Sequence, residues 1–152
     1  TRQYLAIVTG RMESASGIFD TPFGRHPTSR LRFSSRPGGS RRAVTHWSVE
    51  AFYGHAATRV RATLHTGRTH QVRVHFHDAG HSLLGDPLYR RSWHDPRLAA
   101  IAASLGRQAL HAAVLGFVHP FSGKPLLFES APPEDFRRAL EQLRAAFGES
   151  AP

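Results

Sequence analysis

The sequence predicts an α+β fold, with a mixed, largely antiparallel sheet and flanking helices, in a single domain spanning residues 1–152. Two observations support this prediction. Segments in which apolar and polar residues alternate, as in half-buried strands, occur next to one another with short turns between them. Segments with helical periodicity follow them in the order strands, helix, strands, helix. Such an order, with hairpins among the strands, favours the α+β class.

The first half of the chain is predicted to supply most of the strands. Residues 3–10 form a β-rich run that ends at a glycine, whereas residues 14–24 are rich in turn formers and predict a turn region. Residues 31–33 predict a brief strand. Residues 43–53 and 58–64 both alternate, and the glycine between them indicates a β-hairpin.

The second half is predicted to supply the helices and a second hairpin. The apolar residues in 69–79 fit both the alternation of a strand and one face of a helix. A threonine that can cap a helix at the start and a glycine at the end favour the helix. Residues 97–105 predict a short helix closed by glycine. Residues 134–147 predict an amphipathic helix after two prolines. Strands are predicted at residues 110–118 and 126–129, joined by a turn.

The composition favours a polyanionic partner. The formal net charge is +9 and the sequence pI is about 11.4, a balance typical of proteins that bind nucleic acid. Nearly every cation is an arginine, with Lys124 as the only lysine. Because a GC-rich genome produces the same bias, charge alone leaves nucleic-acid binding and a coding bias as two open interpretations.

Cysteine is absent, which excludes disulfides and thiolate metal sites and makes a cytoplasmic location the default expectation. No apolar run approaches the ~20 residues of a membrane-spanning helix, and no signal peptide is visible. The chain does not begin with methionine and opens directly in a strand-like segment. We therefore expect it to be a fragment of a longer domain.

Residues 64–75 concentrate small turn residues, arginines and imidazoles in one stretch. Arg68 follows a glycine and precedes the predicted helix. A guanidinium at that position can pair bidentately with a carboxylate or phosphate, and the free N–H groups of a helix start add positive potential. A solvated surface arginine is the alternative interpretation.

Two basic clusters predict contacts with RNA phosphates, which set affinity and register without reading sequence. The first cluster contains Arg25, His26, Arg30 and Arg32. The second lies on a glycine-containing loop tip and contains Arg36, Arg41 and Arg42. A solvated loop is the alternative for both.

The chain contains 11 histidines, and several of them lie close together in the sequence. A zinc site is the specific hypothesis that such a cluster raises. The cluster lacks a helical histidine pair with a supporting acid, and cysteine is absent. We therefore predict no metal. The clustered histidines are His70, His75, His77 and His81.

The run at 64–75, with residues 80–89 after it, closely resembles the signature of the RluA-type pseudouridine synthases. Other segments resemble the same family in the same order along the chain. They are Arg2 with Tyr4, Gly24–Pro27 with Arg30, Ala43 with Thr45, Gln108–Ala112, and His119–Pro120 with Gly123. The resemblance covers nearly the whole chain and implies the C-terminal portion of a pseudouridine synthase catalytic domain.

This resemblance implies that a uridine in ribosomal or transfer RNA is flipped into a pocket and isomerised without a cofactor or metal. An aspartate acts as nucleophile in that family. Arg68 resembles the arginine that pairs with this aspartate, and Tyr4 resembles the tyrosine that contacts the flipped base. The implied complete enzyme is a monomer that associates with RNA and not with a membrane. Residues expected to bind RNA are Arg25, His26, Arg30, Arg41, Arg42, His70 and Arg73.

The chain departs from the family at the nucleophile. None of its five aspartates stands in the arginine-leucine-aspartate context that the family uses. Asp86 is better suited to a turn, because an aspartate caps turns readily and Pro87 fixes the next φ. Since covalent catalysis needs its nucleophile, we predict that this chain alone is inactive. A non-catalytic RNA-binding module and a histidine-based metalloprotein are the alternative functions.

Overall fold

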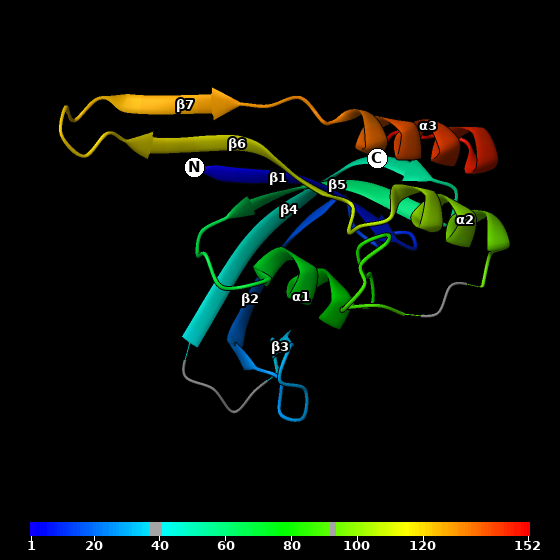
Figure 1. Cartoon of the computed structure of the whole chain (residues 1–152), viewed down its shortest axis with the longest axis horizontal. Helices are drawn as coiled ribbons and strands as arrows, with labels where there is room; N and C mark the ends of the chain where they lie inside the picture. The colour runs from blue at the N-terminus through cyan, green and yellow to red at the C-terminus, as the bar shows by residue number, and fades with distance from the viewer. Residues whose placement is uncertain (37–40, 92–93) are drawn as a thin grey trace.

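The computed structural model describes residues 1–36, 41–91 and 94–152, which form one seven-stranded sheet and three helices (Figure 1). The strands are β1 (Arg2–Thr9), β2 (Ser16–Arg25), β3 (Phe33–Ser34), β4 (Arg41–Tyr53), β5 (Ala57–Leu64), β6 (Leu110–Val118) and β7 (Pro125–Glu129). The helices are α1 (Gln71–Asp78), α2 (Pro96–Leu105) and α3 (Glu134–Phe147).

The strand order is β3-β2-β4-β5-β1-β6-β7, and each neighbouring pair in this order is antiparallel. The predicted α+β class is therefore confirmed. Over the described residues the sheet is antiparallel rather than mixed. Three pairs of consecutive strands, β2–β3, β4–β5 and β6–β7, are neighbours in it, whereas β1–β2, β3–β4 and β5–β6 are separated by other strands.

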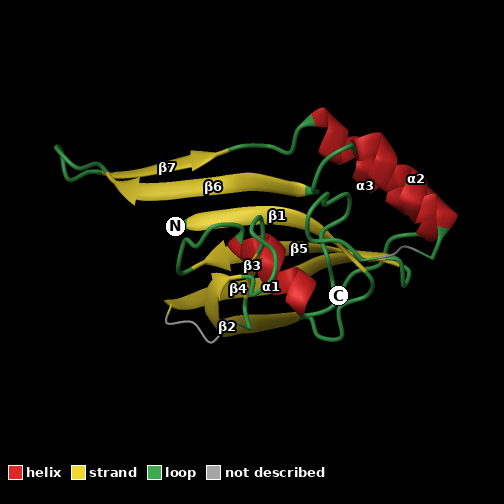
Figure 2. Ribbon diagram, turned by 60° about the horizontal axis from the view of Figure 1, so that its bottom comes forward, coloured by secondary structure: helices red, strands yellow, loops and turns green. Residues whose placement is uncertain are grey.

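Strand β1 lies inside the sheet and is buried on both faces. Leu5 and Ile7 belong to a core cluster with residues of α2 and α3, whereas Ala6 and Val8 belong to a second cluster with residues of α1. Successive side chains of a strand point to opposite faces, so α1 and the α2–α3 pair cover opposite faces of the sheet. Figure 2 shows α2 and α3 side by side at one end, away from α1. Tyr4 shares the face of Ala6 and therefore points toward α1.

The ambiguous segment at 69–79 is a helix, as predicted. It begins at Gln71, one position after a left-handed residue, His70 (φ 58°), so the expected cap Thr69 lies outside it. Gly80, with φ of 92°, follows the helix, and its N–H donates to the carbonyl of His77 (3.0 Å). The glycine therefore ends the helix where the sequence predicts, whereas a tight turn and not a threonine cap starts it.

The other two helices match their predicted ranges closely. The Asp95 side chain caps α2 by accepting from the N–H of Arg97, and Gly106 ends that helix in the left-handed region. Helix α3 begins directly after Pro133 and buries the apolar stripe that contains Phe136, Leu140 and Leu143.

The prediction of a turn region at residues 14–24 is wrong, because Ser16–Arg25 form strand β2. The segment is polar and contains Pro22, and both features disfavour a strand in isolation. Pairing with β4 along eight residue positions overrides that preference. β2 also lies near the edge of the sheet, where a proline without an N–H is tolerated. The brief strand predicted at 31–33 lies slightly later, at Phe33–Ser34.

Candidate active site

A tight turn joins the end of β5 to α1 and carries Arg68. The N–H of Gln71 donates to the carbonyl of Arg68 (3.1 Å), and the left-handed His70 closes the turn. Gly67 lies directly against the guanidinium of Arg2, and a Cβ at this position would overlap it. Glycine at this position therefore lets the Arg2 side chain pack directly against the turn.

The side chain of Gln71 holds this turn in place. Its Oε1 accepts from the hydroxyl of Thr66 (2.8 Å) and from the N–H of Arg68 (3.0 Å). Its Nε2 donates to the carbonyl of Val44 (3.0 Å) and to the hydroxyl of Thr45 (2.9 Å). All four hydrogen-bonding positions of the amide are used, and the residue is buried. Gln71 therefore ties the backbone of Arg68 to strand β4.

His75 extends this network beneath the turn. Its Nδ1 lies 2.8 Å from the Thr45 hydroxyl and its Nε2 lies 2.8 Å from the Thr21 hydroxyl. Each hydroxyl can donate to or accept from the ring nitrogen that it contacts, so a neutral imidazole satisfies both contacts. Burial lowers the pKa of His75 to about 4, which agrees with this neutral imidazole.

Tyr4 and Arg68, far apart in the sequence, line the same pocket of about 250 Å³. Tyr4 reaches it from the α1-facing side of β1, and Arg68 reaches it from the turn that Gln71 holds. We call this space the Tyr4–Arg68 pocket. Its full lining is Tyr4, Leu64, Arg68, His70, Gln71, Val72, Arg73, Gln108 and Leu110.

Arg73 belongs to the wall of this pocket but is bound to a carboxylate. Its Nε and Nη2 donate to the two oxygens of Asp86, each at 2.8 Å, and the Asp86 side chain is fully buried. Burial alone would raise the pKa of Asp86, but hydrogen bonds from Arg73 and from the N–H groups of Tyr89 and Leu88 outweigh it and lower the pKa. The predicted turn role of Asp86 is confirmed by those two backbone bonds.

The five aspartates all lie in the described part of the chain, and none of them lines the Tyr4–Arg68 pocket. Their hydrogen-bonding partners are Arg42 for Asp20, Ser35 for Asp78, Arg73 for Asp86, Arg97 for Asp95 and Arg107 for Asp135. The pocket lining contains no glutamate either. It therefore presents cations and an aromatic ring without a nucleophilic carboxylate.

The residues predicted to bind RNA occupy three different environments. Arg25 and Arg41 line a second pocket that also contains Arg68. His70 and Arg73 line the Tyr4–Arg68 pocket, where burial and the neighbouring Arg73 lower the pKa of His70.

The remaining three members of the set lie outside both pockets. Exposed Arg42 forms an ion pair with Asp20, and the Nδ1 of His26 accepts from the N–H of Ser29 within its own loop. Arg30 is exposed in the same loop, and its carbonyl accepts from the side chain of Arg25. The loop tip with the second basic cluster includes residues 37–40, which lie outside the described residues.

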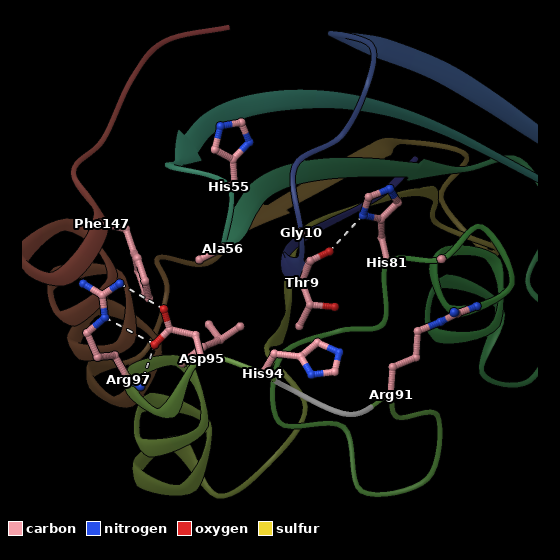
Figure 3. Close-up of a pocket in the computed structure, with 12 residues that line it drawn as sticks. Thr9, Gly10, His55, Ala56, His81, Arg91, His94, Asp95, Arg97 and Phe147 are labelled. Carbon is pink, nitrogen blue, oxygen red and sulfur yellow. Dashed lines mark hydrogen bonds and ion pairs between the residues drawn. The ribbon is translucent and has the colours of Figure 1, made fainter.

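A further pocket, of about 510 Å³, lies where β1 ends (Figure 3). The Asp95–Arg97 ion pair and the hydrogen bond from His81 to the carbonyl of Thr9 shape its wall. It contains neither Tyr4 nor Arg68, and Asp95 is already occupied by Arg97. Within the described ranges, no group of three or more histidine, aspartate or glutamate side chains is placed to hold a metal ion.

Sequence reasoning missed Gln71 and Gln108 as residues of the site. Gln71 lies on the buried face of α1 beside Val72, and a buried glutamine amid apolar positions is the signal that could have revealed it. Gln108 precedes β6 and lines the pocket beside Leu110. It belongs to the Gln108–Ala112 segment that resembles the family, and that resemblance is the signal that could have revealed it.

Comparisons with known proteins agree with this arrangement. A model of the RNA pseudouridylate synthase family matches residues 1–78. Ribosomal large subunit pseudouridine synthase D of Nitrosomonas europaea is 46% identical over 144 residues, which cover 94% of this chain and 41% of that protein. Its namesake in Escherichia coli K12 is 41% identical over 155 residues, which cover 98% of this chain and 46% of that protein.

The chain thus spans less than half the length of these curated relatives. A solved structure, human RNA pseudouridylate synthase domain containing 1, has a TM-score of 0.72 at 22% identity, covering 96% of this chain and 66% of that one. This likeness supports the fold. No helix in the described part of the chain is long and apolar enough to cross a membrane. The family match and the relatives together show that the chain belongs to the RluA-type RNA pseudouridine synthases.

Proposed function

We propose that this chain forms the part of a pseudouridine synthase catalytic domain that holds the target uridine of an RNA. The observation that carries the proposal is that Tyr4 and Arg68 line one pocket. The names of the relatives favour large-subunit ribosomal RNA as the substrate, with transfer RNA as the alternative. We place this activity in the cytoplasm.

Each of the two residues has a physical role in this proposal. The ring of Tyr4 offers a face on which a flipped uracil can stack. The guanidinium of Arg68 supplies the counter-charge that keeps a partly buried carboxylate ionised, since an opposite charge within a few ångströms favours the charged form. His70 and the Asp86-paired Arg73 complete the wall, and Gln71 keeps the Arg68 turn in place.

We also propose that the 152 residues alone do not catalyse the reaction. A covalent mechanism needs a carboxylate in this pocket, and every aspartate of the chain is bound to a partner elsewhere. The same observation favours the second candidate function, a non-catalytic RNA-binding module. The two candidates differ in whether a nucleophile supplied by further sequence produces activity.

A chimera tests the proposal. The chain is joined to the segment of the E. coli relative that precedes its matched region, and tritium release from 5-tritiated uridine in ribosomal RNA transcripts is measured. We expect release by the chimera and none by the isolated chain. Arg68→Gln in the chimera should lower the rate by about 100-fold, the scale of losing one preorganised electrostatic partner. Arg137→Gln, on the exposed side of α3, should leave the rate unchanged.

Two results would contradict the proposal in different ways. Tritium release by the isolated chain would show that one of its own side chains is the nucleophile. A chimera that folds and binds RNA but releases no tritium would instead favour the non-catalytic module.

A further inference from the structure

A second pocket, of about 420 Å³, adjoins the Tyr4–Arg68 pocket and shares Arg68 with it. Strands β2, β3 and β4 and the turn before α1 form its wall. Its lining is Phe23, Gly24, Arg25, Phe33, Arg41, Gly67, Arg68 and Thr69. We call it the tri-arginine pocket, after Arg25, Arg41 and Arg68.

Two of the three guanidiniums are held in place by the protein. The Nε of Arg68 donates to the carbonyl of Arg42 (3.1 Å). The Nη1 of Arg25 donates to the carbonyl of Arg30 (3.1 Å), and its guanidinium lies 5.2 Å from the centre of the Phe33 ring. These contacts fix the orientation of the two side chains but use only one N–H of each. The remaining donors are available to a ligand.

The pocket concentrates positive charge without a counter-charge. None of its lining residues is acidic, and among the described residues no carboxylate forms an ion pair with Arg25, Arg41 or Arg68. Arg42, next to Arg41 in β4, instead pairs with Asp20. Three guanidiniums around one cavity repel one another, so an anion bound between them is strongly favoured. Arginine forks match the oxygens of a phosphate in particular.

We propose that the tri-arginine pocket binds a phosphodiester of the RNA beside the nucleotide whose base enters the Tyr4–Arg68 pocket. This inference rests on the proposed function, and it assigns base and phosphate to two pockets that meet at Arg68. Because Arg68 lines both pockets, a nucleotide with its base in one would place a neighbouring phosphodiester near the other. Arg68 thus contacts both the reaction pocket and the phosphate that keeps the nucleotide in register.

The test measures binding of a fluorescently labelled RNA hairpin with uridines in its loop to the 152-residue chain, over a series of KCl concentrations. We expect Arg25→Gln with Arg41→Gln to weaken binding at least about tenfold, because charged hydrogen bonds to one phosphate are lost. The slope of log affinity against log salt should become shallower by about 0.7–0.9, the value for one phosphate. Each single variant should produce most of this change, since the arginines share one ligand.

A matched control removes the same charge elsewhere. Arg137→Gln with Arg138→Gln, on the exposed side of α3, should change affinity by less than about twofold and leave the slope unaltered. Circular dichroism checks that each variant is folded, which we expect because Arg25 and Arg41 are exposed.

The outcomes separate the two proposals. If the unaltered chain does not bind the hairpin, the proposed RNA function fails. If it binds and the pocket variant behaves like the control, the RNA function stands and the phosphate pocket is overturned. A loss of RNA affinity confined to the pocket variant supports both the RNA function and the phosphate pocket.

Discussion

Two arginines from the same short run, Arg68 and Arg73, lie in opposite chemical situations. Arg73 donates two hydrogen bonds to the buried carboxylate of Asp86, and its own side chain is only 11% exposed. Arg68 lines two pockets, and its side chain donates a hydrogen bond to the carbonyl of Arg42. Asp86 thus neutralises Arg73, whereas no carboxylate among the described residues forms an ion pair with Arg68.

The difference shows how one pattern of residues serves both structure and function. A buried arginine with a bidentate carboxylate holds elements together, here α1 and the turn at Asp86. The network from His75 through Thr45 and Gln71 then fixes the turn that carries Arg68. These buried hydrogen bonds therefore hold the turn that presents Arg68 to the two pockets.

Removing the partner of Arg73 should have the largest effect on stability. Asp86→Asn keeps an oxygen for the backbone of Leu88 and Tyr89 but leaves the Arg73 charge buried without a counter-charge. We expect a loss of about 3–5 kcal/mol in the free energy of unfolding. Urea denaturation followed by circular dichroism measures it.

A double variant provides the control for this effect. Arg73→Met with Asp86→Asn removes both charges, so it should be less destabilised than Asp86→Asn alone. If the two variants are equally destabilised, the cost does not come from an unmatched charge.

The histidine network predicts a dependence of stability on pH. The folded pKa of His75 is about 4, below the usual 6.5, so the unfolded chain binds the proton more readily. The contribution is therefore fully present above pH 6.5 and is lost as the pH falls toward 4, up to about 3 kcal/mol. His75→Phe should flatten the curve of unfolding free energy against pH over this window, and an unchanged slope would contradict the assignment.

Removing the amide beneath Arg68 should have a smaller effect. Gln71→Leu removes the acceptor of the Arg68 N–H, which costs about 1–3 kcal/mol. Hydrogen exchange at the amide of Arg68 should become faster, as measured by NMR. If the exchange rate does not change while stability falls, Gln71 supports the core and not the turn.

The smallest effect on stability is expected at Arg68 itself. Because its guanidinium has no carboxylate partner among the described residues, Arg68→Gln should change the free energy of unfolding by no more than about 0.5 kcal/mol. Thermal melts of this variant beside Asp86→Asn make the contrast direct. A large loss at Arg68 would mean that both arginines are structural.

Much of the fold follows from local patterns in the sequence. In helix α3 and in the hairpin of β4 and β5, the apolar residues repeat with a single dominant period. Gly80 and Gly106 end their helices because a positive φ suits glycine. Strand β2 has no such pattern, since its polar residues are stabilised by pairing with β4 and by an edge position. A short stretch of sequence does not reveal such pairing between distant strands.

The sequence by itself determined the basic character of the chain, its family signature and the residues that carry it, Tyr4 and Arg68 among them. Only the tertiary structure decided which arginines are bound to carboxylates and which remain open to a ligand. Arg68 and Arg73 differ because Asp86 lies against Arg73, whereas no carboxylate of the described residues pairs with Arg68. The physical reason is that ion pairing and burial depend on distances in space, which residue spacing along the chain does not specify.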